Sequence, residues 1–428
     1  MRTSREDRLG VGSLTGLVVG SMIGAGVFTT SGLALSDLGS PDLVMLAWGV
    51  GGVLALSGAV SYGGLVRHIT DSGGEYLFLS RLVHPVAGFV GGWVSLLAGF
   101  TVPIAFAALA FEAYAAPLFP APVPAGSIAA TVILLAALLH GIDVRTGVLA
   151  QNAAVIVKVA FLGLFIAFAA GVTLGGDVTA QPVAAQPFSL PAFAATLVWI
   201  SLSYSGFNAA VYVAGEAENA RVNAPRALWL GTALVTAIYL GLNAAFVYLP
   251  PVEVVAGRED VAAAAALSIG GSLLSVLVRA LISLALLTSV LSMVMSGPRV
   301  YARMADDGMF PEAFRFRAGP PRRAVALQAV LAVAVALSTE LTQLLSYLGF
   351  TLSISTALTV ASLFVLHHRE GRRAVTVPGY PVTPACFVLG TLVLAGIAGV
   401  NNPVELTTAL LTLLTGSLIY LVLKKYRP

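Results

Sequence analysis

Long apolar runs, separated by short polar segments, follow one another along the chain from residue 11 to residue 423. Most runs hold about 18 or more residues without a charge, the length that a helix needs to cross a hydrocarbon core of about 30 Å. They are rich in Leu, Ala, Val and Gly and lack the alternation of barrel strands, so they predict helices. Twelve spans are predicted, near residues 11–35, 43–66, 76–112, 125–142, 146–172, 191–216, 227–250, 271–304, 324–338, 342–366, 382–400 and 404–423. The pattern therefore predicts an all-α membrane fold.

The composition agrees with this fold class and excludes most others. Hydrophobic residues make up 58% of the 428 residues and charged residues only 10%, whereas charged residues make up roughly a quarter of a soluble domain. No polar stretch is long enough for a soluble catalytic domain. The 5 histidines fall at or near predicted helix ends, without the spacing of metal ligands, and no nucleophile and base form a pair. We therefore expect no enzyme, no cofactor, no metal and no nucleic-acid partner, with membrane lipid as the surroundings.

Basic residues gather on one side of the predicted membrane. Nearly all of the 23 Lys and Arg residues fall in the N-terminal segment, in alternate loops and at the C-terminus, and Arg258 is the clear exception. By the positive-inside rule, both termini are cytoplasmic and the number of spans is even.

The run behind Arg2, Arg5 and Arg8 is too long for a signal-peptide core, so we expect a retained first helix in a multi-pass protein of the plasma (inner) membrane. Arg279 is expected near the outer end of helix 8, with its charge at the membrane surface and a gating role as the alternative.

Two of the predicted helices are interrupted by small residues. Residues 20–28 of the first read Gly-Ser-Met-Ile-Gly-Ala-Gly-Val-Phe, and residues 203–208 of the sixth read Ser-Tyr-Ser-Gly-Phe-Asn. Breaks in corresponding places of two five-helix halves are typical of an inverted-repeat transporter that binds its substrate near the bilayer midplane. A channel would instead need a charged or carbonyl-rich ring. The predicted organisation is an N-terminal tail with repeat 1 at 1–175, repeat 2 at 191–368, and two further helices with the C-terminal tail at 378–428.

The chemistry of the breaks suits a zwitterion. A half-helix that resumes after a break presents free N–H groups and its positive dipole end to a carboxylate. A half-helix that stops leaves carbonyl oxygens that favour an ammonium group. Gly20, Gly24 and Gly26 lower the cost of leaving helical geometry. The alternative is that these glycines only allow close helix packing, but the coincidence with a second break favours a substrate site.

In these stretches the chain resembles the amino acid–polyamine–organocation (APC) superfamily, closest to its amino acid permeases and L-amino-acid transporters (LAT). The segment at 20–28 is similar to the family's helix 1 signature. Further similar stretches are Ser-Gly-Gly-Glu-Tyr at 72–76, Gly-Phe-Val-Gly-Gly-Trp at 88–93, Tyr-Ser-Gly-Phe-Asn at 204–208, Gly-Glu-Ala-Glu-Asn at 215–219, Asn-Ala-Pro-Arg at 223–226, Arg-Val-Tyr-Ala-Arg-Met-Ala at 299–305 and Pro-Gly-Tyr-Pro at 378–381. They cover nearly the whole chain and are specific for the superfamily, though not for a substrate.

The resemblance implies a LeuT-type fold of ten core helices in a 5+5 inverted repeat plus two peripheral helices, working by alternating access. Carried over by position, the amides of Ala25 and Gly26 would hold the substrate carboxylate. The carbonyls of Met22, Leu202 and Ser205 would hold its ammonium. The neighbouring residues complete the expected substrate-binding set, namely Ile23, Gly24, Gly206, Phe207 and Asn208. Relatives often have Ser or Thr at Ala25 and an aromatic gate at Leu202, so a hydroxyl contact and one form of occlusion are missing.

Lys158 is a charged residue deep within the fifth predicted span. It lies about a dozen residues from the start of that span, roughly 18 Å at 1.5 Å per residue, too far for easy snorkelling. A charge there is costly and needs a partner or a purpose, and burial allows reversible proton binding. In proton-coupled members of the family that this chain resembles, a helix 5 lysine takes the place of sodium and bridges helices 1 and 8. The resemblance implies contacts with a carbonyl near Gly20 and with Thr288 or Ser289; the alternative is a fixed charge that pins the helices.

The expected cargo follows from the absence of acidic residues in the central parts of helices 1, 3, 6, 8 and 10. This absence of acidic side chains favours neutral L-amino acids over polyamines or cationic amino acids as the substrate. The expected function is a sodium-independent, proton-coupled secondary active transporter, with amino acid exchange or polyamine or cationic transport as alternatives. LAT relatives of eukaryotes bind a partner through a cysteine in the loop at 114–127. This loop has none, and Cys386 is the only cysteine, so we expect no disulfide-linked partner.

Overall fold

The computed structural model describes residues 9–71, 73–119, 124–142, 147–174, 187–315 and 321–425. Within these ranges the regular structure is helical, apart from an isolated parallel bridge between Leu9 and Ala217. The α-helices are α1 (Val11–Met22), α2 (Gly26–Leu38), α3 (Pro41–His68), α4 (Gly74–Leu82), α5 (Pro85–Val94), α6 (Val102–Ala115), α7 (Ser127–Ile142), α8 (Gly147–Leu174), α9 (Leu190–Ser203), α10 (Ala220–Tyr248), α11 (Val252–Val255), α12 (Val261–Asp306), α13 (Arg322–Ser338), α14 (Leu341–Glu370), α15 (Val382–Gly399) and α16 (Pro403–Lys425). The shorter helical segments are the π-helical η2 (Ser95–Thr101) and the 3-10 segments η3 (Ala116–Leu118), η4 (Ala209–Glu216), η5 (Glu312–Phe314) and η6 (Arg372–Ala374).

Membrane-length helices dominate the described part of the chain. Eight helical segments there are long and apolar enough to cross a membrane, and the bent pair of α1 and α2 makes a ninth. The helices α7 and α9 are apolar but shorter, and α13 has 17 residues. These three helices overlap the spans predicted at 125–142, 191–216 and 324–338. The all-α membrane fold is therefore confirmed, while the count of twelve spans and the inverted repeat stay predictions.

Local signals explain where the first helices start and stop. The φ angle of Gly39 is 61°, a left-handed value that glycine adopts readily, and α2 ends there. Pro41 then opens α3 at a position where the missing amide costs nothing. The Ser40 side chain caps this helix by accepting a hydrogen bond from the Leu43 amide at 3.4 Å. The turn between the first two predicted spans is thus encoded by three consecutive signals in the sequence, Gly39, Ser40 and Pro41.

Two predicted spans differ in detail from the structure. The span expected at 76–112 is divided, because Pro85 starts the new helix α5 and the ring Nδ1 of His84 accepts a hydrogen bond from the Val86 amide at 3.2 Å. The span expected at 271–304 lies within the longer α12. This helix is interrupted at Gly271, where φ is 72° and ψ is −169°. Residues 261–270 therefore form a separate helical segment before the predicted span.

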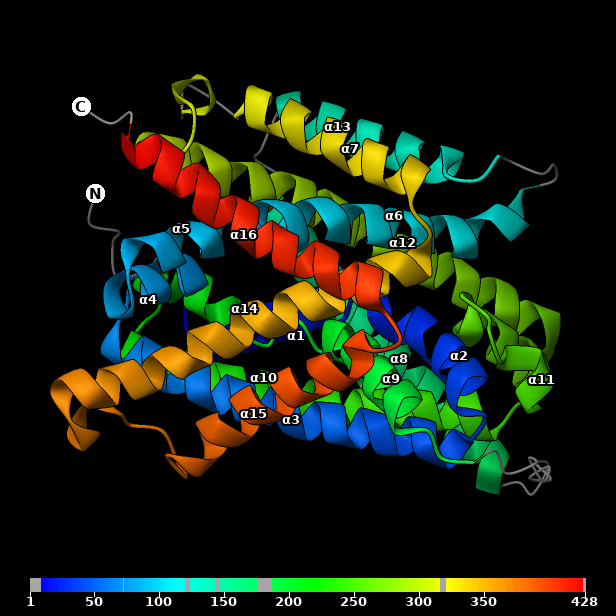
Figure 1. Cartoon of the computed structure of the whole chain (residues 1–428). Helices are drawn as coiled ribbons and strands as arrows, with labels where there is room; N and C mark the ends of the chain where they lie inside the picture. The colour runs from blue at the N-terminus through cyan, green and yellow to red at the C-terminus, as the bar shows by residue number, and fades with distance from the viewer. Residues whose placement is uncertain are drawn as a thin grey trace.

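The helices form one bundle with α3 and α10 packed together along one side and α15 beside them (Figure 1). On the opposite side α7 packs against α13. The end of the bundle where α3 ends and α4 begins carries Arg67, Arg81 and Arg372, and we call it the basic end; α11 marks the opposite end. Burial differs with position, since 61% of the apolar window of α14 is buried but only 22% of that of α16. The broken helices α1–α2 and α9–η4 lie among these elements.

Candidate functional site

The first break separates α1 from α2. The two helices are bent by 41° relative to each other, and Ile23 leaves helical geometry with φ −74° and ψ 85°. The Gly24 amide turns back to the Met22 carbonyl oxygen at 2.8 Å. Because the first N–H groups of a helix have no acceptor within that helix, the start of α2 at Gly26 presents donors at the break. The predicted interruption of helix 1 is therefore present where the sequence places it.

The second break follows α9, which ends at Ser203. Gly206 lies in the left-handed region with φ 98°, which side chains other than glycine rarely adopt. The chain then continues as the 3-10 segment η4 rather than as an α-helix. The Ser205 amide donates to the Leu202 carbonyl oxygen at 2.9 Å, so this carbonyl is already engaged. One glycine thus redirects the backbone of the sixth predicted helix.

The two breaks are in direct contact. A methyl group on Gly206 would lie 2.7 Å from the Ser21 carbonyl oxygen and 3.1 Å from the Met22 amide. A methyl group on Gly26 would lie 2.8 Å from the Cα of Ser203. At Gly206 the backbones of the two broken segments therefore meet directly, while at Gly26 both the Cα and the side chain of Ser203 lie against the glycine. The structure thus brings Met22 and Gly26 of the first break close to the second break, where Gly206 and Ser203 contact them, although the two breaks lie far apart in sequence.

Not every glycine of the first break is required by packing. A methyl group on Gly20 would lie 2.7 Å from the Val155 side chain, so Gly20 allows α1 to approach α8. Gly24 differs, because the nearest atom to such a methyl group is the Met22 carbonyl oxygen at 3.9 Å. Close packing therefore accounts for Gly20 but leaves Gly24 without a packing reason. That contrast favours a conformational role for Gly24.

Tyr239 of α10 joins the two breaks, and the sequence reasoning missed it. Its hydroxyl group lies 2.6 Å from the carbonyl oxygen of Met22 and 2.9 Å from that of Ser203. The ring packs against Trp48 at 5.3 Å and against Tyr204 at 5.2 Å between centroids. A phenol has one proton to donate, so it serves one carbonyl at a time. The only signal in the sequence was a tyrosine in the middle of an apolar run.

Lys158 reaches the first break from α8. It is 8% exposed, and its ammonium Nζ donates a hydrogen bond to the Ile23 carbonyl oxygen at 2.9 Å. The acceptor is thus three residues beyond Gly20, near which the contact was expected. Thr288 lines the same cavity as Lys158, and the hydroxyl groups of Thr288 and Ser289 donate to a carbonyl of their own helix at 2.8 and 3.0 Å. The cavity holds about 210 Å³ and lies between α2, α8 and α12.

The remaining predicted residues lie on the other face of the second break. A cavity of about 40 Å³ is lined there by Leu202, Ser205 and Phe207 together with residues of α3, α14 and α15. This volume suits a few water molecules rather than an amino acid. Asn208 points elsewhere, because its side-chain amide donates to the carboxyl group of Glu75. Among the residues that the structure describes, no group of three His, Cys, Asp or Glu side chains could hold a metal ion.

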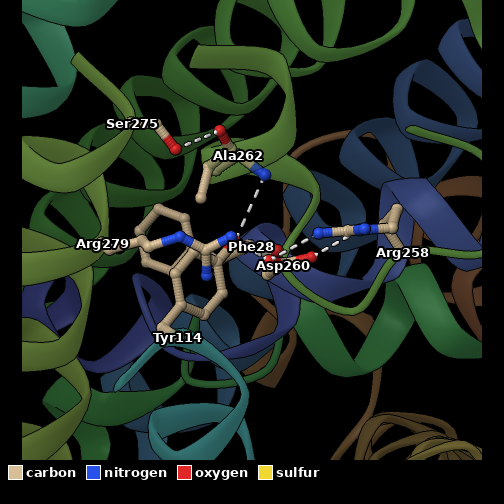
Figure 2. A network of polar contacts seen from close by, with 8 residues as sticks. Phe28, Tyr114, Arg258, Asp260, Ala262, Ser275 and Arg279 are labelled. Carbon is tan, nitrogen blue, oxygen red and sulfur yellow. Dashed lines mark hydrogen bonds and ion pairs between the residues drawn. The ribbon is translucent and has the colours of Figure 1, made fainter. Parts of the chain in front are cut away.

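A polar network joins α2 to the opposite end of the bundle (Figure 2). The Tyr114 hydroxyl donates to the Phe28 carbonyl oxygen at 2.6 Å and accepts from the Ala262 amide at 3.2 Å. The Gly257 amide donates to the Gly32 carbonyl oxygen at 2.7 Å. The half-helix that follows the first break is therefore tied to α6 and to the segment between α11 and α12.

Asp260 is the acidic centre of this network. Its carboxylate accepts hydrogen bonds from Arg258 at 2.8 and 3.0 Å and from Arg279. Burial raises the pKa of Asp260, but the hydrogen bonds and charges of Arg258 and Arg279 outweigh burial and hold the pKa below its usual value. The Arg279 side chain is only 12% exposed. It therefore ends in a buried ion pair rather than at the surface, where the sequence placed it.

Comparison with known proteins agrees with this architecture. The sequence profile of the family described as amino acid permease matches residues 9–423. The serine/threonine exchanger SteT of Bacillus subtilis is 26% identical over 96% of this chain and 95% of its own. The large neutral amino acids transporter small subunit 2 of Homo sapiens is 27% identical over 97% of this chain and 80% of its own. The b(0,+)-type amino acid transporter 1 of Homo sapiens is 24% identical over 99% of this chain and 89% of its own. With a profile match that extends over nearly its full length, this chain belongs to the amino acid permease family.

Proposed function

We propose that the chain is a secondary active transporter that moves neutral L-amino acids across the plasma membrane by alternating access, independent of sodium and coupled to protons. The observation that carries the proposal is the contact between two broken helices, with a buried lysine on a carbonyl of the first break. Named relatives of the chain are amino acid transporters and exchangers. The proposal includes twelve spans, the 5+5 inverted repeat at 1–175 and 191–368 with two further helices at 378–428, and cytoplasmic termini.

The proposed substrate site uses backbone groups for both charges of the amino acid. The amides at Ala25 and Gly26 face the carboxylate at the start of α2, where the helix dipole adds a partial positive charge. The ammonium takes carbonyl oxygens at Met22, Leu202 and Ser205. The Met22 carbonyl already accepts a bond from Tyr239, so substrate binding and the Tyr239 bond compete or share this oxygen. No charged side chain is required, which suits a neutral amino acid.

Lys158 is the proposed coupling residue. Its ammonium holds the Ile23 carbonyl oxygen, a ligand of the kind that a sodium ion would otherwise take. A lysine that gives up its proton keeps only a weaker, uncharged donor for this carbonyl, which loosens the first break from α8. Protonation then becomes linked to the position of the broken helix. This link would make transport respond to a proton gradient rather than to sodium.

Exchange of one amino acid for another is the second candidate. The relative from Bacillus subtilis is a serine/threonine exchanger by name. In that case Lys158 would keep its proton and act as a fixed pin between α8 and the first break. The substrate, rather than a proton, would then drive each change of state.

The test is uptake of radiolabelled L-serine, L-threonine and L-leucine into liposomes that contain the purified protein. Three conditions separate the candidates: a proton gradient, a sodium gradient, and unlabelled amino acid inside. We expect uptake that rises with an inward proton gradient and does not depend on sodium. Uptake only with internal amino acid would favour exchange, and no uptake of any amino acid under the three conditions would reject the proposed function.

A further inference from the structure

A buried carboxyl group lies at the start of α4, at the basic end. Glu75 is only 6% exposed. Its oxygens accept hydrogen bonds from the Tyr62 hydroxyl at 2.9 Å, from the Tyr212 hydroxyl at 2.5 Å and from the Asn208 side-chain amide. A buried carboxylate without such donors would be costly. The three donors therefore compensate for the lost hydration of Glu75.

The donors belong to two different elements. Tyr62 is a fully buried residue of α3, whereas Asn208 immediately precedes η4 and Tyr212 lies within it. Glu75 itself belongs to α4, so one carboxyl group ties the segment after the second break to two helices. Among the described residues, no ion pair from Lys, Arg or His to Glu75 is present. The attachment depends on neutral donors and so has directional geometry.

The backbone around Glu75 fits this attachment closely. Gly74 has a φ of 58°, and a methyl group there would lie 2.6 Å from the Cδ1 atom of the Tyr212 ring. Only glycine therefore lets α4 begin directly against η4.

The end of η4 is held separately, because the Leu9 amide donates to the Glu216 carbonyl at 3.0 Å and the Glu218 amide donates to the Leu9 carbonyl at 2.9 Å.

We propose that Glu75 is a positioning residue for the amino acid site, which rests on the function proposed above. Asn208 is two residues beyond Gly206, whose backbone contacts the first break. A carboxyl group that fixes Asn208 and Tyr212 therefore fixes how the second break meets the first. Without it, η4 loses its attachment to α3 and α4, and the carbonyls of the second break lose their defined places. Glu75 acts through these residues and does not touch the substrate.

The experiment measures initial uptake rates in proteoliposomes against amino acid concentration, with whichever of L-serine, L-threonine and L-leucine the wild type takes up fastest. The variants are Tyr212→Phe, Glu75→Gln, Glu75→Ala and the double variant Glu75→Ala/Tyr212→Phe. Loss of one hydrogen bond to a charged group should raise KM by roughly tenfold. We expect Tyr212→Phe to show this rise, Glu75→Ala to show a larger one, and Glu75→Gln to fall between wild type and Glu75→Ala. The double variant should be no worse than Glu75→Ala, because the Tyr212 hydroxyl has then already lost its acceptor.

The matched control is Tyr347→Phe, which removes a hydroxyl that lies 3.1 Å from Thr412 on α16, away from the breaks. This variant should keep the wild-type KM. A merely structural role for Glu75 would lower the maximal rate and the melting temperature with KM unchanged, and that result overturns the inference. If Glu75→Ala does not fold, the KM values of Tyr212→Phe and Glu75→Gln still test whether Glu75 positions the amino acid site. A wild type that transports no amino acid rejects the proposed function and this inference with it, whereas an active wild type with unchanged KM in these two variants rejects only the inference.

Discussion

Lys158 is a buried cation whose ammonium contacts a backbone carbonyl oxygen instead of a carboxylate. The chain thus pairs a removable positive charge with a permanent dipole. A carboxylate partner would become a buried, uncompensated charge when the lysine loses its proton, at a cost of several kcal/mol. A carbonyl partner avoids that cost. A carbonyl acceptor is therefore compatible with reversible protonation of Lys158.

Two substitutions separate proton coupling from a fixed charge at position 158. Lys158→Ala removes the contact to Ile23, and we expect it to abolish the response of uptake to a proton gradient. Lys158→Arg keeps the charge but does not release its proton at physiological pH. Gradient-driven uptake in proteoliposomes should therefore fail in both variants if coupling requires proton release. Uptake that survives unchanged in Lys158→Arg and disappears in Lys158→Ala would instead identify a fixed pin, and survival in both would remove the lysine from the mechanism.

The single residues that sequence reasoning found and missed differ in a physical way. Lys158 was found because a charge in an apolar run is rare and expensive. Tyr239 and Glu75 were missed because a tyrosine fits an apolar run and a glutamate fits a helix start. Their roles depend on partners far along the chain, such as Met22 for Tyr239 and Asn208 for Glu75. Only the packing of distant helices reveals such pairs.

The broken helices show how one backbone angle can set the geometry of an element. Gly206 redirects the sixth predicted helix through a φ of 98°. The same glycine provides the contact surface for Ser21 and Met22 on the first break. Both the left-handed backbone conformation at Gly206 and the close contact between the two breaks therefore depend on the absence of a side chain at this position. The two requirements make this position less tolerant of substitution than a glycine that meets only one of them, such as Gly20.

Gly206→Ala should be damaging for both reasons. The left-handed conformation costs an alanine roughly 1–2 kcal/mol, and the added methyl group would lie 2.7 Å from the Ser21 carbonyl oxygen. We expect a lower melting temperature and a loss of most uptake. The control is Gly163→Ala in α8, where no atom lies within 4 Å of the added methyl group. Equal melting temperatures and uptake in the two variants would contradict this account of the second break.

The elements were more predictable than their interruptions. The apolar runs gave the positions of the membrane helices because the bilayer requires about 20 apolar residues for each span. A glycine cluster located the first break and the single Gly206 among small polar residues located the second, since glycine lowers the cost of irregular backbone. The contact between the breaks, the division at Pro85 and the helical segment before Gly271 did not follow from the runs. They depend on tertiary packing and on local turns that hydropathy does not register.

At the scale of the whole molecule, two groups of hydrogen bonds attach the broken helices to their neighbours, one group at each end of the bundle; we call these contacts ties. At the basic end Glu75 and Leu9 hold η4. At the opposite end Tyr114 and the Asp260 network hold α2. A transporter that opens alternately to each side would have to release one group of ties at a time. The two groups therefore mark the contacts whose strengths would set the balance between the two open states.

The Asp260 network should make stability depend on pH in one direction. The pKa of Asp260 is lowered in the folded protein, so its contribution is present above the unfolded value of about 3.9 and is lost as pH falls through the folded value. Asp260→Asn leaves Arg279 without its buried partner, which should cost about 3 kcal/mol at neutral pH. The melting temperatures of wild type and variant should differ at neutral pH and converge below about pH 4.

The control for this prediction is Glu253→Gln, which changes an exposed acid of α11 in the same part of the chain. Its melting temperature should follow that of the wild type at every pH. A difference between wild type and Asp260→Asn that stays constant down to the acid limit would show that the carboxylate charge does not supply the stability.

The short backbone pairing between Leu9 and Ala217 has a practical consequence for protein engineering. A shortened protein that starts at Gly10 would lose both backbone hydrogen bonds that secure the end of η4. A truncation for crystallisation that removes Leu9 would therefore loosen the segment that follows the second break. Affinity tags and fluorescent fusions are better placed at the C-terminus, behind α16, where no such pairing involves the described residues.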